Sequence, residues 1–196
     1  MRRFLIIGFL LAVVIGVPAV QADDLKIPED VSPFIEPGTK AIELSQADLN
    51  GDGLADYILV LERQGDQYKD GPGQRPLLIL LRNPDGGLRL AKRNDKIIFC
   101  SNCGGVMGDP FMGVEAGTKR FIVSHYGGSS WRWSVTYQFN YSGRDKSWQL
   151  VKVVSESFHA SEPDKVERKV ETPPKDYGLI DIADFDPEKY LGVGLK

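Results

Sequence analysis

The stretch Trp131-Arg-Trp-Ser-Val-Thr-Tyr-Gln-Phe-Asn-Tyr141 alternates between large apolar and polar residues along its whole length. In an extended chain one face would carry Trp131, Trp133, Val135, Tyr137, Phe139 and Tyr141. A helix would scatter these side chains around its axis, whereas a strand keeps them on one face. The segment therefore predicts a long β-strand. Its aromatic face is expected to pack in the core, with Trp131 at the strand start the most exposed. The alternative is an exposed face whose aromatic rings stack on sugar rings, as in glycan-binding modules.

Strand signals continue on both sides of this segment. A turn at Ser142-Gly-Arg-Asp145 leads into the apolar run 148–154, and residues 119–125 form a further apolar run before it. Residues 57–61 and 77–81 are short apolar runs bounded by turn residues, which favours strands over helices. We therefore expect a mostly β, antiparallel domain that is sandwich-like or propeller-blade-like, with irregular N- and C-terminal arms.

The N-terminal residues predict export. Arg2 and Arg3 precede the apolar run Phe4–Val17, and Val20-Gln-Ala22 supplies small residues for cleavage. This layout is typical of a signal peptide over residues 1–22. Without it the chain keeps 22 basic residues against 27 acidic ones, a net charge of −5. We expect a periplasmic or secreted protein with no membrane span after signal cleavage.

Composition divides the remaining chain into three parts. Residues 23–40 are Pro-rich and acidic and predict an extended N-terminal arm, residues 41–160 carry the strand signals and form the β-domain, and residues 161–196 predict a charged, Pro-containing tail. Within this tail, residues 162–171 favour a short exposed helix or a linker, and residues 181–191 a short terminal helix or tail. The acidic net charge leaves no basic surface for nucleic acid.

The most specific motif is Asp48-Leu-Asn-Gly-Asp-Gly-Leu-Ala-Asp56. Oxygen donors recur along it in the side chains of Asp48, Asn50, Asp52 and Asp56 and in the Leu54 carbonyl. Alternate residues of such a loop turn their oxygens toward one hard cation, and Ca²⁺ takes roughly six to eight of them. Leu59 stands where an EF-hand has its bidentate Glu. We predict a Ca²⁺ site that fastens a hairpin; the alternative is a metal-free turn capped by its own side chains.

The run Ala47–Val60 resembles the calcium loop of FG-GAP/VCBS-type repeats, in which DxNxDGxxD precedes a hydrophobic strand of a propeller blade. The resemblance implies the side-chain ligands Asp48, Asn50, Asp52 and Asp56. It covers one loop only, so it does not imply a complete propeller. The runs Cys100–Phe111 and Ser124–Trp133 resemble a group of small exported bacterial proteins of unknown function, a likeness that names no activity.

Cys100 and Cys103 are the only cysteines. In an exported protein this C-x-x-C pair favours a small structural disulfide. A redox pair normally opens a helix, whereas Gly104-Gly105 follows here. Zinc is the third alternative, because the two cysteines with His125 and His159 make a set of four ligands.

A candidate ligand or partner surface consists of Asp109, His125, Trp131 and Arg132, next to Gly-rich turns. His125 follows Phe121 and Val123 at a spacing of two, so a packed core histidine is the simplest interpretation. The alternative is a general base with Asp109 or Ser129 as companion, although no GxSxG elbow is present.

These signals favour a non-enzymatic, calcium-stabilised, exported β-protein. We expect it to act as a binding or interaction module for an unknown protein or glycan partner at the cell envelope. An immunity or inhibitor protein is a sharper version, since an acidic surface complements a basic enzyme. The alternative is an envelope enzyme, either a hydrolase around His125 or a thiol oxidoreductase through Cys100 and Cys103.

Overall fold

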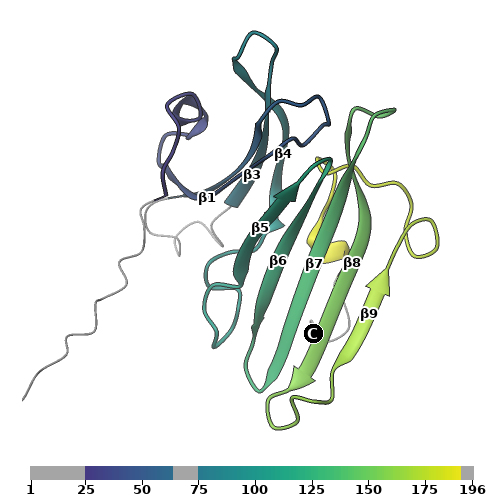
Figure 1. Cartoon of the computed structure of the whole chain (residues 1–196). Coiled ribbons are helices and arrows are strands. Elements are labelled where there is room, and N and C mark those ends of the chain that lie inside the picture. The colour runs from purple at the N-terminus through teal and green to yellow at the C-terminus, as the bar shows by residue number, and fades with distance from the viewer. Residues whose placement is uncertain (1–24, 64–74, 191–196) are drawn as a thin grey trace, which may run out of the picture.

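The computed structural model describes residues 25–63 and 75–190 (Figure 1). The predicted signal peptide, residues 1–22, lies outside these residues. Among the described residues no helix has the length and apolar character needed to cross a membrane.

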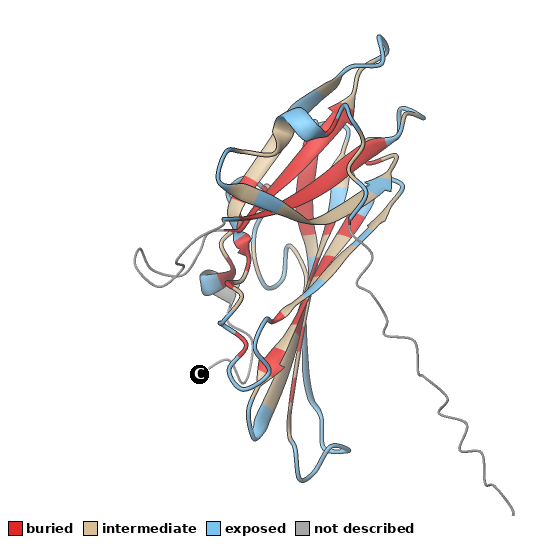
Figure 2. Ribbon diagram, turned by 90° about the vertical axis from the view of Figure 1, so that its left-hand side faces the viewer, coloured by how far each residue is buried: buried red, intermediate tan, exposed pale blue. Residues whose placement is uncertain are grey.

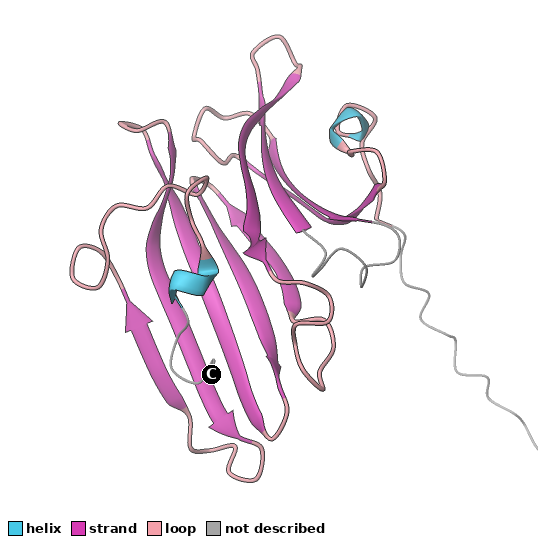
Figure 3. Cartoon of the chain, turned by 180° about the vertical axis from the view of Figure 1, so that it is seen from behind, coloured by secondary structure: helices cyan, strands magenta, loops and turns pink. Residues whose placement is uncertain are grey.

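The described residues form strands and two short 3-10 helices. In chain order these elements are η1 (Ser32–Phe34), β1 (Thr39–Ala47), β2 (Asp56–Arg63), β3 (Arg75–Arg82), β4 (Leu88–Ile98), β5 (Phe111–Gly117), β6 (Arg120–Gly128), β7 (Trp131–Ser142), β8 (Ser147–His159), β9 (Glu167–Glu171) and η2 (Pro187–Tyr190). One sheet has the order β1-β2-β3-β4 and the other β5-β6-β7-β8-β9, and every neighbouring pair is antiparallel (Figure 3). The predicted fold class, mostly β and antiparallel, is confirmed.

Strand β7 follows the alternation read from its sequence. Val135, Tyr137 and Phe139 are buried in the core between the two sheets, while the residues between them are only partly buried. Tyr137 lies between Val123 of β6 and Val153 of β8, so the three strands present one continuous apolar face. The aromatic face is therefore core, as expected.

Strands β2 and β3 are buried on both faces, as Figure 2 shows. Ile58 and Val60 of β2 face the second sheet, whereas Leu59 and Leu61 face the opposite way. Residues of the N-terminal arm cover this outer face, and Val31 of the arm is fully buried there. Double-sided burial explains why these strands are continuous apolar runs without alternation.

The C-terminal part is more integrated than a tail. The segment 162–171, for which a short helix or linker was expected, contains strand β9 at the edge of the second sheet. Ile182 and Phe185 are buried in the main core. Asn94 Nδ2 of β4 donates to their carbonyl oxygens at 2.6 and 2.7 Å, which ties this segment to the first sheet.

Candidate metal centre

The motif of residues 48–56, here called the acidic loop, connects β1 to β2. Gly51 and Gly53 have φ values of 81° and 85°, which favour glycine. Asp48 Oδ1 accepts hydrogen bonds from the backbone N–H groups of Gly51 at 2.7 Å and Asp52 at 3.1 Å. Asp48 Oδ2 accepts from Gly53 N at 3.1 Å. The backbone therefore wraps around the first carboxylate of the motif.

The middle of the loop repeats this arrangement. Asp52 Oδ1 accepts from Leu54 N at 2.9 Å, and Asn50 Oδ1 accepts from Asp52 N at 2.9 Å. Asn50 Nδ2 donates to Asp52 Oδ2 at 2.8 Å. Asn50 and Leu54 thus contact Asp52 within the loop. These bonds also agree with the metal-free alternative, because Asx turns form without a cation.

Asp56 is the buried member of the loop and is fully shielded from solvent. Its Oδ2 accepts from Leu49 N and its Oδ1 from Arg82 N, both at 2.9 Å. Burial, reinforced by the carboxylates of Asp52 and Asp48, raises the pKa of Asp56 although both backbone bonds oppose that shift. Among the described residues, none of the three aspartates forms an ion pair within 4.0 Å.

Three of the five predicted ligands converge. One carboxylate oxygen from each of Asp48, Asp52 and Asp56 lies within 4.8 Å of the others. Among the described residues this is the one group of His, Cys, Asp or Glu side chains close enough to share a metal ion. Oxygen-only donors are the type that hard cations such as Ca²⁺ and Mg²⁺ prefer.

The acidic loop is bonded to the second sheet as well as the first. Leu49 is fully buried, and its carbonyl oxygen accepts from Trp148 Nε1 of β8 at 2.9 Å. The Asp48 carbonyl accepts from Lys119 N, in the turn between β5 and β6, at 2.9 Å. A cation held by this loop would therefore act at a joint between the two sheets.

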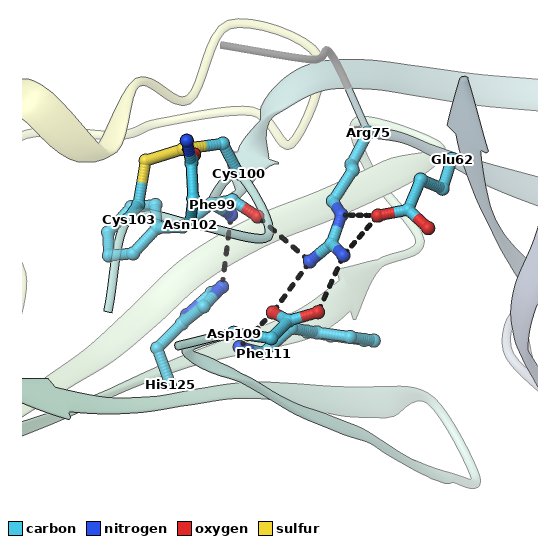
Figure 4. Close-up of a disulfide and its surroundings, with 9 residues drawn as sticks. All are labelled: Glu62, Arg75, Phe99, Cys100, Asn102, Cys103, Asp109, Phe111 and His125. Atoms are coloured by element: carbon cyan, nitrogen blue, oxygen red, sulfur yellow. Dashed lines mark hydrogen bonds and ion pairs between the residues drawn. A yellow bond between two sulfur atoms is a disulfide. The ribbon is translucent and has the colours of Figure 1, made fainter. Parts of the chain in front are cut away.

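A second charged group lies near the other end of β2 (Figure 4). We call it the Arg75 cluster; it consists of Lys40, Glu62, Arg75 and Asp109. The guanidinium of Arg75 donates to Glu62 Oε1 from Nε at 2.9 Å, and to the two carboxylate oxygens of Asp109 at 2.7 and 2.6 Å. Lys40 Nζ lies 3.0 Å from Glu62 Oε2. Two cations thus face two carboxylates.

The electrostatics of the Arg75 cluster are opposite to those of the acidic loop. Burial on its own would raise the pKa of Glu62, but the hydrogen bonds from Arg75 and Lys40 bring that pKa below its ordinary value. Burial on its own would also raise the pKa of Asp109. The hydrogen bonds from Arg75 and from the Phe111 N–H outweigh burial, so the pKa of Asp109 is lowered. Both acids are satisfied by the chain. Arg75 and Glu62 carried no sequence signal, because their partners are distant in the chain. Arg75 lies 13 residues from Glu62 and 34 residues from Asp109.

His125 is buried beside this cluster. Its Nε2 accepts from Phe99 N at 3.3 Å, and its ring stacks on that of Phe99 at a centroid distance of 4.3 Å. Burial lowers the pKa of His125 to about 3, so the imidazole is neutral at ordinary pH. The core interpretation agrees with this placement. A buried histidine does not belong to an exposed ligand surface, and the hydrolase alternative loses its accessible base.

Cys100 and Cys103 form a disulfide, with 5.2 Å between their Cα atoms. The glycines that follow fold back onto β6, where Gly128 N donates to Gly104 O at 2.9 Å. The zinc set is not assembled, because the two sulfur atoms are bonded to each other and, among the described residues, the cysteines and histidines do not form a group close enough to share a metal ion. The disulfide agrees with the favoured prediction, a small structural disulfide between Cys100 and Cys103.

The remaining members of the predicted surface are spread out. Trp131 is 57% exposed at the start of β7, whereas Asp109 is held by Arg75. Arg132 is partly buried, and its Nη1 has no hydrogen-bond partner among the residues that the structure describes. Neighbouring residues of a strand point to opposite faces, so Trp131 and Arg132 do not share one surface. The structure does not unite Asp109, His125, Trp131 and Arg132 in one site.

Comparisons with known proteins add no identity: no family model, no curated protein and no solved structure matches this chain.

Proposed function

We propose that the acidic loop binds Ca²⁺ and that the chain is an exported, calcium-stabilised β-protein without catalytic activity. The observation that carries the proposal is the convergence of Asp48, Asp52 and Asp56. One carboxylate oxygen of each lies within 4.8 Å of the others, and Asp56 is fully buried. Carboxylates this close repel one another, and uptake of a proton or of a cation relieves that repulsion. The spacing of the motif supports Ca²⁺, with water completing the shell.

A turn elsewhere in the chain provides the contrast. Between β3 and β4, Asp85 Oδ1 accepts from Gly87 N at 2.9 Å, which is the same kind of capping bond as in the acidic loop. That turn contains one exposed carboxylate, so its capping function needs no cation. In the acidic loop the capping aspartates also converge, and the repulsion among three carboxylates is what a bound cation would relieve.

The role we propose for Ca²⁺ is structural. The loop that holds it is bonded to β8 through Trp148 and to the β5–β6 turn through Lys119. Ordering the loop therefore also orders the contact between the sheets. A ligand that binds only the folded chain stabilises it in proportion to the logarithm of its concentration.

Export and a binding role are supported by separate features. The Cys100–Cys103 disulfide suits an oxidising compartment, as does the signal-like sequence of residues 1–22. A partner at the cell envelope, a protein or a glycan, finds exposed apolar residues at Val106 and Trp131, which are 81% and 57% exposed. Aromatic residues are enriched where proteins bind partners.

The test of the calcium site is calorimetric titration of Ca²⁺ into chelator-treated protein. We expect saturable heat with the native chain and none with Asp52→Ala, because Asp52 supplies one of the three converging carboxylates. Asp85→Ala is the matched control, since it removes an exposed capping aspartate from another turn and should leave binding intact. Absence of heat with the native protein would refute the calcium site.

A further inference from the structure

Lys119 is held next to the acidic loop by its backbone. It stands in the two-residue turn between Gly117 and Arg120, with a left-handed φ of 58° that is unfavourable for lysine. Its N–H donates to Asp48 O at 2.9 Å, and its carbonyl accepts from Tyr141 N at 2.8 Å. These two bonds lock the residue in place despite its backbone conformation.

The side chain of Lys119 lies across Gly51, in the middle of the acidic loop. A Cβ atom added at Gly51 would come within 1.7 Å of Lys119 Cε and 2.7 Å of Nζ. Glycine at this position therefore does two things: it adopts a φ of 81°, and it leaves room for the lysine stem. The ammonium group is placed at the loop, and among the described residues it forms no ion pair with the loop's carboxylates within 4.0 Å.

We propose that Lys119 is a tethered cation that sets the affinity of the acidic loop for Ca²⁺ by partly neutralising it, so that removing this charge tightens calcium binding. The inference rests on the proposed calcium site. It adds a regulating residue that the spacing of the motif does not contain. The ammonium compensates part of the charge of three converging carboxylates while Ca²⁺ is absent, and it repels the ion when it arrives.

The absence of direct ion pairs determines how Lys119 acts. A lysine that bonded a carboxylate would block a ligand position, and its removal would open a coordination site. An ammonium that lies nearby without bonding acts through its field, which falls with distance and with added salt. The effect should therefore be moderate and strongly dependent on ionic strength.

The experiment compares calcium dissociation constants of the full chain by calorimetry in low and high salt. Lys119→Met keeps an unbranched side chain over Gly51 and removes the charge; we expect about 3- to 10-fold tighter binding in low salt, with most of that gain lost at about 0.5 M salt. Lys119→Arg keeps the charge and should bind like the native chain. Lys146→Met is the matched control, since Lys146 has the same left-handed backbone, with φ 49°, in the β7–β8 turn.

The outcomes separate this inference from the calcium site itself. Unchanged or weaker binding by Lys119→Met, or an equal gain in Lys146→Met, would overturn the role of Lys119 while the native chain still binds Ca²⁺. A gain that persists undiminished in high salt would overturn it too, because a field effect is screened. If neither the native chain nor Lys119→Met binds Ca²⁺, the calcium site fails and the role of Lys119 fails with it. Lys119→Gln provides a second uncharged variant should the methionine variant not fold.

Discussion

The two ends of strand β2 carry buried carboxylates in opposite electrostatic settings. Asp56 begins the strand and is surrounded by backbone N–H donors and by two further carboxylates, Asp48 and Asp52. Glu62, near the end of the strand, is bonded to Arg75 and lies 3.0 Å from Lys40. The pKa of Asp56 is raised, chiefly by burial, whereas that of Glu62 is lowered because its two cations outweigh burial.

The difference separates an element of structure from a candidate site. A buried acid whose charge is balanced by the chain needs nothing from outside, and its network serves to hold the fold. A buried acid that lies among other carboxylates and has no ion pair of its own favours uptake of a proton or of an external cation. The Arg75 cluster is the first kind and the acidic loop the second, although both are rich in carboxylates.

Replacing Arg75 should have the largest effect. Arg75→Met leaves the buried Glu62 without its main partner and frees Asp109, so we expect a loss of about 3–5 kcal/mol in the free energy of unfolding, measured by urea denaturation. Arg120→Met removes an exposed ion pair with Glu115 and should cost less than about 1 kcal/mol. Equal losses in the two variants would show that the Arg75 cluster is no more than a surface contact.

Calcium should stabilise the native chain by an intermediate amount. At a free Ca²⁺ concentration about 100 times the dissociation constant, we expect a gain of about 2.7 kcal/mol over chelated protein, measured by the same denaturation. Arg75→Met should show the same gain, because its cluster lies at the other end of β2, and Asp52→Ala should show none. A gain retained by Asp52→Ala would place the ion elsewhere.

Acid should weaken the fold by a smaller amount through His125. The folded chain holds this imidazole neutral down to a pKa of about 3, whereas in the unfolded chain it takes up a proton near its ordinary pKa of 6.5. The stability that depends on neutral His125 is therefore complete above pH 6.5 and falls by about 1.4 kcal/mol per pH unit below it. Between pH 6.0 and 4.5 we expect a loss of about 2 kcal/mol by thermal or urea unfolding. His125→Phe should flatten this slope; an unchanged slope would assign it to the carboxylates.

Much of the fold was predictable because burial leaves a periodic trace in the sequence. The alternation over residues 131–141 predicted β7, and the apolar runs 57–61 and 77–81 predicted the doubly buried parts of β2 and β3. Strand β9 was not predicted, because its sequence Glu-Arg-Lys-Val-Glu has no apolar face. It pairs with β8 at the edge of the sheet. An edge strand is specified by the open hydrogen bonds of its neighbour, which leave no pattern in its own residues.

The candidate site was predictable only in its local part. Asp48, Asp52 and Asp56 lie within nine residues, so their convergence follows from turn geometry and glycine positions. Lys119 reaches the loop from a distant hairpin, and its approach depends on how the second sheet docks. The same applies to Asp109, which the sequence marked as a candidate ligand and which the structure uses as a partner of Arg75.

The sequence of neighbouring residues therefore specified the strands, the carboxylate spacing and the Cys100–Cys103 disulfide, because each depends on residues a few positions apart. Docking of the two sheets decided which charges are balanced. It placed Arg75 between Glu62 and Asp109, buried His125, and brought Lys119 to the acidic loop. Electrostatic energy depends on distance in space and on burial, and both are set only when segments far apart in the chain pack together.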